Sequence, residues 1–171
     1  MATSHSQLTL VLGGARSGKS RYAETLIAAE PPPWAYIATA EPLDNEMRAR
    51  IAAHRARRGT GWQTIEAPRD LAGALATNAG GAVLVDCLTL WLSNLMLADA
   101  DVEAESARLE RALTSIATPV VLVSNEVGSG IVPENALARR FRDAQGRLNQ
   151  RIAARADRVV LMVAGLPLVV K

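Results

Sequence analysis

A glycine-rich segment near the start of the chain, GGARSGKS at residues 13–20, constrains the fold more than any other feature of the sequence. It fits the pattern G-x-x-x-x-G-K-S, in which glycines allow backbone N–H groups to surround phosphate oxygens. An apolar run at residues 8–12 precedes the segment, and a helical pattern over residues 19–29 follows it. A glycine turn with an incidental lysine is the alternative, but the order strand, loop, helix favours a phosphate-binding loop.

Two side chains of this segment carry the chemistry expected of such a loop. Lys19 is the only lysine before the last residue, Lys171, and we expect it to reach the β- and γ-phosphates of a nucleotide. The hydroxyl of Ser20 is expected to hold Mg²⁺. The sequence therefore predicts that this protein binds a nucleoside triphosphate.

The remainder of the chain alternates short apolar runs with helical stretches, which is typical of a parallel sheet covered by helices. Further strands are expected at residues 34–37, 62–66, 82–86 and 119–123, and further helices at about residues 44–58, 68–78, 101–116 and 134–156. Residues 158–163 and 168–170 flank a Gly-Leu-Pro turn and predict a terminal hairpin. We expect one α/β domain spanning residues 1–171, with a mostly parallel sheet flanked by helices.

Composition excludes several other classes of protein. The chain is 49% hydrophobic and 21% charged, as in globular proteins, and its net charge of +2 is too small to indicate a nucleic-acid partner. No apolar run is long enough to span a bilayer, and no basic region precedes the first apolar run, so neither a membrane span nor a signal peptide is expected. A single cysteine, Cys87, excludes an internal disulfide and fits the cytoplasm.

A carboxylate at the end of a second buried strand is a candidate for the metal side of the nucleotide site. Asp86 closes the run VLVD, where an acid that positions Mg²⁺ is expected. The alternative is an acid that caps the next turn, because such residues are common turn formers. Glu126, after the run VVLVSN, is a weaker candidate for the same role.

The segment MRARIAAHRARR at residues 47–58 places His54 among five arginines, and the only other histidine is His5. On a helix, His54 shares a face with Arg50 and Arg58, whereas Met47 and Ile51 are expected in the core. One interpretation is a solvated arginine face with an incidental histidine.

The other interpretation of this segment is chemical. Neighbouring guanidinium groups favour the neutral, nucleophilic form of an imidazole, and they also bind phosphate oxygens. A neutral imidazole facing an arginine-held phosphate can attack phosphorus and form a phosphoramidate. Together with the triphosphate site, this predicts nucleotidyl or phosphoryl transfer through His54.

Several segments resemble those of one known family, the bifunctional adenosylcobinamide kinase/adenosylcobinamide-phosphate guanylyltransferases. These segments are GGARSGKSRYAE, YIATA, RIAAHRARR, VSNEVGSGIVPEN and ARRFRDAQGRLNQRIA, and the resemblance extends over residues 8–171. It implies a RecA-like P-loop fold, a homotrimer and a role late in cobalamin synthesis.

The resemblance also implies two reactions. The first phosphorylates the aminopropanol hydroxyl of adenosylcobinamide with ATP or GTP. In the second, His54 attacks the α-phosphate of GTP and pyrophosphate leaves. The phosphate of adenosylcobinamide phosphate then displaces the histidine from its covalent GMP, giving adenosylcobinamide-GDP.

Site residues follow from the same match, with His54 and Lys19 catalytic and Ser20 and Asp86 at the metal. Nucleotide contacts are expected from Gly13, Gly14, Ala15, Arg16, Ser17, Gly18, Lys19, Ser20, Ala38, Thr39, Ala40, Arg55, Ala56, Arg57, Arg58, Glu66 and Asp86. Members of the family can have glutamate in place of Asp86, and Glu66 has an alternative interpretation as an exposed acid at a strand end.

Two rival functions fit parts of this pattern. A single-function P-loop kinase for a small molecule would use His54 and its arginines only as a lid over phosphates. A RecA-like module that assembles in response to nucleotide would show little turnover of any small molecule. Only the guanylyltransferase should retain label from GTP on a denaturing gel.

Overall fold

The computed structural model describes residues 8–78 and 80–171, and the side chain of Arg50 and the residue His5 lie outside the described part. The order of elements alternates strands and helices through most of the chain. The elements are β1 Leu8–Gly13, α1 Lys19–Ala28, β2 Trp34–Ala38, α2 Asn45–Arg57, β3 Trp62–Glu66, α3 Leu71–Ala76, β4 Val83–Asp86, α4 Leu88–Leu97, α5 Val102–Ser115, β5 Val120–Asn125, α6 Ala136–Arg155, β6 Arg158–Val163 and β7 Leu166–Val169.

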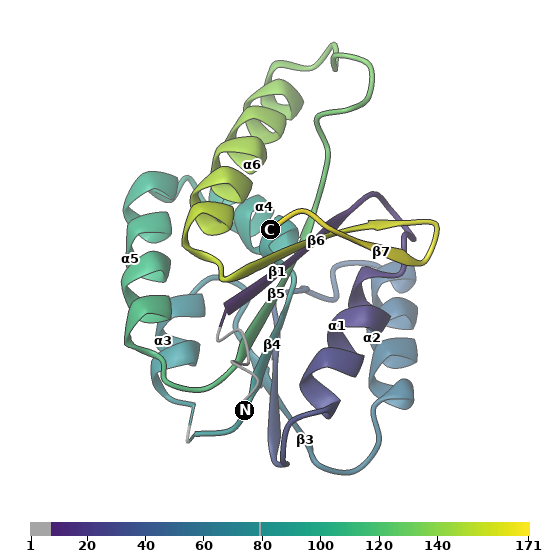
Figure 1. Cartoon of the computed structure of the whole chain (residues 1–171). Coiled ribbons are helices and arrows are strands. Elements are labelled where there is room, and N and C mark those ends of the chain that lie inside the picture. The colour runs from purple at the N-terminus through teal and green to yellow at the C-terminus, as the bar shows by residue number, and fades with distance from the viewer. Residues whose placement is uncertain (1–7, 79) are drawn as a thin grey trace.

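All of these strands join one sheet in the order β3-β2-β4-β5-β1-β6-β7. Every neighbouring pair is parallel except β6 and β7, which form the antiparallel hairpin. Figure 1 shows α1 and α2 on one side of the sheet and α3, α4, α5 and α6 on the other. The predicted α/β fold, with a mostly parallel sheet flanked by helices and a hairpin at the end, is confirmed.

Alternation along the strands supplies the two hydrophobic layers. Successive residues of a strand point to opposite faces of a sheet. On β4, Val83 and Val85 therefore pack in the cluster beneath α3 to α6, whereas Leu84 packs in the cluster beneath α1. On β2, Tyr36 belongs to the α1 cluster by the same alternation. This places Tyr36 and Asp86 on the side of the sheet that carries α1 and α2.

Helix α4 was not predicted, and its composition explains why. Leucines and a tryptophan occur around most of its circumference, so it lacks the apolar stripe of an amphipathic helix, and Leu88, Trp91, Leu92 and Leu95 are buried. Within the described ranges, no helix is both long and apolar enough to cross a bilayer. Several boundaries also differ from expectation; α3 begins at Leu71 after its N-cap, β7 begins at Leu166 after a tight turn, and β5 extends to Asn125.

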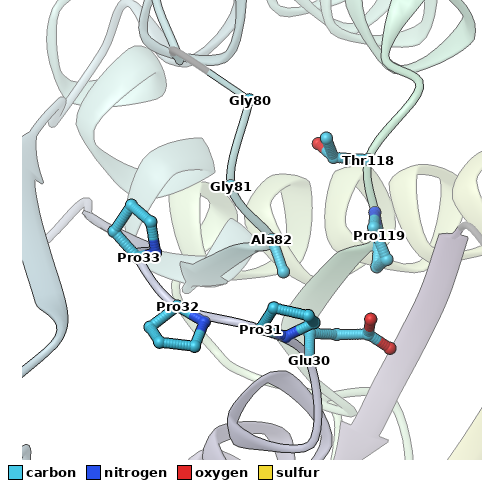
Figure 2. Close-up of a pocket in the computed structure, with 9 residues that line it drawn as sticks. All are labelled: Glu30, Pro31, Pro32, Pro33, Gly80, Gly81, Ala82, Thr118 and Pro119. Carbon is cyan, nitrogen blue, oxygen red and sulfur yellow. The ribbon is translucent and has the colours of Figure 1, made fainter.

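Gly81 lies where two parallel strands begin close together (Figure 2). A Cβ atom on Gly81 would lie 2.2 Å from the carbonyl oxygen of Pro33, so one of the two backbones would have to move. We expect Gly81→Ala to lower the free energy of unfolding by about 1–3 kcal/mol, as overpacking does. Urea unfolding measures this, with Gly130→Ala as the control, because nothing lies within 4 Å of a Cβ there. Equal midpoints for the two variants would contradict the expectation.

Candidate active site

A large hollow lies at the carboxyl ends of β1, β2, β4 and β5, between the glycine-rich loop and α2. Its volume is about 920 Å³. A smaller hollow of about 310 Å³, drawn in Figure 2, lies at the opposite edge of the sheet, where strands begin. Open α/β sheets bind ligands outside the carboxyl ends of their strands, so the larger cleft is the candidate site.

Most of the residues expected from the sequence line this cleft. They are Ala15, Arg16, Ser17, Gly18, Lys19, Ser20, Ala38, Ala40, His54, Arg55, Arg57, Arg58, Glu66 and Asp86. They come from the loop after β1, the end of β2, helix α2, the end of β3 and the end of β4. The structure thus brings together side chains that are separated by up to about 70 residues in the sequence.

The glycine-rich loop has a conformation suited to an anion. Arg16 and Gly18 both have positive φ angles, 55° and 93°, and left-handed residues of this kind occur in anion-binding nests. Lys19 is 8% exposed, and its Nζ donates hydrogen bonds to the carbonyl oxygen of Gly14 and to Ser17 Oγ. The lysine therefore lies folded into the loop, next to the position where phosphate oxygens would bind.

The hairpin at the end of the sheet also supports this loop. Ala164 and Gly165 form its turn with φ angles of 51° and 81°, as a tight hairpin turn requires. The backbone N–H of Gly165 donates a 3.0 Å hydrogen bond to the carbonyl oxygen of Ser17. The hairpin turn thus holds the glycine-rich loop in addition to the hydrogen bonds within the loop itself.

Helix α2 crosses the cleft and is held mainly by polar contacts. None of its residues with a described side chain is buried. Arg57 Nη2 lies 3.0 Å from Glu24 Oε1 on α1, and Arg55 Nη2 lies 2.8 Å from Glu66 Oε1 on β3. Two of the arginines expected to hold nucleotide are therefore paired with carboxylates that lie at the same cleft or beside it.

Arg58 differs from these two arginines. Its guanidinium carbon lies 3.5 Å from the centre of the Tyr36 ring, a cation–π contact. Its Nη1 is buried and has no hydrogen-bond partner within the described part of the chain. An unsatisfied buried donor is costly, and an anion in the cleft would supply the missing acceptor.

His54 faces the carboxylate of Asp86. Their side chains are 25% and 11% exposed, and His54 Nδ1 lies 3.8 Å from Asp86 Oδ2. The Tyr36 hydroxyl donates a 3.1 Å hydrogen bond to the same oxygen. Burial, followed by the negative charge of Asp86, raises the pKa of Tyr36 above its ordinary value, so the hydroxyl stays protonated and remains a donor.

Several expected residues lie elsewhere than the sequence indicated. Thr39 is fully buried, and its hydroxyl bridges the backbone N–H and carbonyl of Cys87, which links the ends of β2 and β4. Gly13, Gly14 and Ala56 do not line the cleft. Met47 and Ile51, expected in the core, are half-buried and line the cleft, because α2 packs on no apolar layer.

The weaker metal candidate, Glu126, is also away from the cleft. Its carboxylate accepts a hydrogen bond from the backbone N–H of Gly128. It is absent from the residues that line the cleft, whereas Ser20 and Asp86 are among them. The hydroxyl and carboxylate oxygens of Ser20 and Asp86 are ligands that Mg²⁺ accepts, together with water and phosphate oxygens.

The sequence interpretation missed Tyr36 and Asn125 as cleft residues. Tyr36 lies two residues before Ala38 on β2, so both point to the same face of the sheet, and that spacing could have indicated it. Asn125 ends β5, and its backbone is held on both sides, because its N–H donates to Thr89 Oγ1 and its carbonyl accepts from Asn149 Nδ2.

Comparisons with known proteins agree with this arrangement. The CobU family model, described as cobinamide kinase / cobinamide phosphate guanyltransferase, matches residues 9–170. The bifunctional adenosylcobalamin biosynthesis protein CobP of Pseudomonas aeruginosa is 50% identical, covering 95% of this chain and 96% of that protein. The corresponding protein CobU of Salmonella typhimurium is 45% identical, covering 96% and 99%.

Among solved structures, the RadB recombinase aligns with a TM-score of 0.47 and 15% identity, covering 90% of this chain and 73% of that chain. The family match and the curated relatives span nearly the whole length of the chain and include the loop, α2 and the strand ends that form the cleft. The chain belongs to the cobinamide kinase / cobinamide phosphate guanyltransferase family and is therefore a bifunctional enzyme of cobalamin biosynthesis with kinase and guanylyltransferase activities.

Proposed function

We propose that the cleft first phosphorylates adenosylcobinamide with ATP or GTP and then transfers GMP from GTP to adenosylcobinamide phosphate through His54. One observation carries the second step: His54, Asp86 and the unsatisfied guanidinium of Arg58 line the same cleft as the phosphate-binding loop. A kinase needs only the loop and an acceptor hydroxyl. The histidine, in a cleft with an arginine whose Nη1 lacks a hydrogen-bond partner within the described residues, adds what a nucleotidyl transfer through a covalent intermediate requires.

In the kinase step, the loop binds the triphosphate and the γ-phosphoryl group passes to the aminopropanol hydroxyl. Lys19 exchanges its contact with the Gly14 carbonyl for phosphate oxygens and stabilises the charge that develops during transfer. Backbone N–H groups of the loop and the N-terminus of α1 add positive potential at the same place. The products are adenosylcobinamide phosphate and the nucleoside diphosphate.

In the guanylyl step, an imidazole nitrogen of His54 attacks the α-phosphorus of GTP. The new bond is P–N, and the bond that breaks joins the α-phosphorus to the oxygen of the leaving pyrophosphate. An oxygen of adenosylcobinamide phosphate then attacks the same phosphorus, the P–N bond breaks and the imidazole is regenerated. Arg58 lines the cleft and its buried Nη1 has no hydrogen-bond partner within the described residues, and we assign it to the phosphate oxygens during both attacks.

We assign Mg²⁺ to Ser20 and Asp86, whose oxygen atoms fit this ion. When bound, Mg²⁺ neutralises phosphate charge and orients the triphosphate. Within the described residues there is no group of three or more His, Cys, Asp or Glu side chains that could hold a metal by themselves. Phosphate oxygens and water would therefore complete the coordination, as is usual for Mg²⁺ at nucleotides.

Asp86→Asn tests this assignment. The amide removes the negative charge, so the variant should need more Mg²⁺ for half-maximal triphosphate use and should turn over more slowly, while its fold is preserved. Titration of the kinase rate with MgCl₂ measures the change, and Asp143→Asn, whose carboxylate lies on α6 beside Arg142, serves as the matched control. Identical Mg²⁺ curves for wild type and Asp86→Asn would remove Asp86 from the metal site.

Labelled GTP separates this proposal from its rivals. Protein incubated with α-labelled GTP and Mg²⁺ should retain label after denaturation. Phosphorylation of cobinamide without retained label would favour the single-function kinase. Nucleotide-dependent assembly with no turnover of cobinamide would favour the assembly module, and the guanylyl step proposed above would then be wrong.

The proposal also covers the oligomeric state of the protein. We propose a homotrimer, and the exposed apolar side chains of the terminal hairpin, Leu166, Leu168, Val169 and Val170, give it a surface to bury. Light scattering should then give three times the chain mass of 18.2 kDa.

We place the reactions in the cytoplasm, because a single cysteine fits a reducing compartment.

A further inference from the structure

Tyr36 contacts two of the groups that surround His54, although it carries no role in the chemistry described above. Its ring lies beneath the guanidinium of Arg58, 3.5 Å from the guanidinium carbon, and its hydroxyl donates to Asp86 Oδ2 at 3.1 Å. The side chain is only 5% exposed and packs in the hydrophobic layer beneath α1. An aromatic neighbour, Trp62, lies edge-on to its ring at a centroid distance of 6.2 Å.

We propose that Tyr36 is a positioning residue, whose hydroxyl fixes the carboxylate of Asp86 so that Asp86 orients the imidazole of His54 for attack on the α-phosphorus. This inference rests on the proposed guanylyl step. The contacts form a chain from Tyr36 Oη to Asp86 Oδ2 and from there to His54 Nδ1, which lies 3.8 Å away.

The chain of contacts selects one nitrogen as the nucleophile. A carboxylate facing Nδ1 favours the tautomer that carries its proton there, which leaves the lone pair on Nε2. When Nε2 bonds to phosphorus and pyrophosphate leaves, the proton stays on Nδ1 and the ring gains a positive charge. Asp86 lies beside that charge and stabilises it, as an orienting carboxylate does for a catalytic histidine.

The register of the sheet keeps this arrangement rigid. Tyr36 pairs with Leu84 and Ala38 pairs with Asp86 across the parallel strands β2 and β4. The side chains of Tyr36 and Asp86 therefore point to the same face from adjacent strands, with the pair Ile37 and Val85 between them in the register. Since both Asp86 contacts use Oδ2, the other carboxylate oxygen remains for Mg²⁺ or its water, and the two roles of Asp86 are compatible.

Tyr36→Phe isolates the hydroxyl, because phenylalanine keeps the ring beneath Arg58. We expect the rate of GMP adduct formation at saturating GTP to fall about 10- to 100-fold, as when an outer partner of a functional histidine is lost. The kinase step does not use His54, so the kinase rate should fall less than the rate of adduct formation. Tyr22→Phe is the matched control, since Tyr22 is the only other tyrosine and its hydroxyl contacts Arg158 outside the cleft.

A spectroscopic measurement tests the arrangement without requiring any turnover. The chain has only two histidines, so the ¹⁵N imidazole spectrum contains two spin systems, and His54→Asn identifies that of His54. At alkaline pH, wild-type His54 should show the tautomer protonated at Nδ1. In Tyr36→Phe the spectrum should move toward a mixture of the two tautomers, and in Tyr22→Phe it should not.

The two measurements distinguish the possible failures. If wild-type protein forms no adduct but Tyr36→Phe shifts the His54 spectrum, the guanylyl step is wrong, and only the orientation of the imidazole by Tyr36 and Asp86 stands. If wild-type protein forms the adduct and Tyr36→Phe changes neither the rate nor the spectrum, the positioning role alone is wrong. A slower adduct with an unchanged His54 spectrum also overturns it, because the hydroxyl would then act by another route.

Discussion

His54→Asn should abolish covalent attachment of GMP and the guanylyl transfer, while most of the kinase activity remains. Asparagine keeps a polar side chain on α2 but removes the nitrogen that attacks phosphorus. The kinase step depends on the phosphate loop, which this change does not touch. Intact-protein mass with and without GTP and Mg²⁺ measures the adduct directly, and pyrophosphate release should disappear in parallel.

The chemistry of the bond identifies the residue independently. A phosphorus–nitrogen bond should be labile in acid and comparatively stable in base, unlike an ester of serine or threonine. Cys87 also lines the cleft, but burial raises the pKa of its thiol to about 11, so it stays protonated near neutral pH. His5→Asn is the matched control and should keep the adduct. An adduct that persists in His54→Asn would show that another side chain is the nucleophile.

Lys19→Ala should lower kinase turnover by about a hundredfold or more, in line with the loss of one preorganised electrostatic contact. The buried ammonium lies inside the glycine-rich loop, and this chain has no other lysine near the cleft to replace it. Steady-state phosphorylation of cobinamide with ATP and with GTP measures the loss. The larger part should appear in kcat, because the charge on the phosphoryl group grows during transfer.

The other lysine supplies the control for this variant. Lys171 donates to the carbonyl oxygens of Ala153 and Ala154, outside the cleft, so Lys171→Ala should leave the kinase rate unchanged. Near-normal phosphorylation by Lys19→Ala would contradict the assignment of the phosphate-binding loop. Melting temperatures of both variants show whether any loss of activity comes from loss of folded protein.

Local patterns predicted the fold well where chemistry and periodicity coincide. The strand, loop and helix around Lys19 follow from glycine positions and an apolar run that are contiguous in the sequence. The apolar run that ends at Asp86 likewise predicts a strand with an acid at its end. By contrast, α4 escaped prediction because a helix buried around most of its surface has no amphipathic period to detect.

The side chains that hold the site residues in place could not be predicted, because their contacts join segments that are distant in the sequence. Tyr36 meets Asp86 only because β2 and β4 are neighbours in a particular register, and the sequence does not specify that pairing. The position of Thr39 could not be predicted for the same reason. Only the tertiary structure shows that its hydroxyl forms hydrogen bonds with the backbone of Cys87. The ion pairs of Arg55 and Arg57 also depend on where α2 crosses the cleft.

The place of β1 in the sheet has a consequence for folding during translation. This strand carries the phosphate-binding loop, but its two neighbours, β5 and β6, come from the last third of the chain, and Leu8 pairs with Val120. At about 5–20 residues per second, a ribosome needs on the order of ten seconds to make the segment between them. The loop must wait through that interval before its scaffold exists, so a nascent chain should become able to bind nucleotide only after β5 and β6 have emerged from the ribosome.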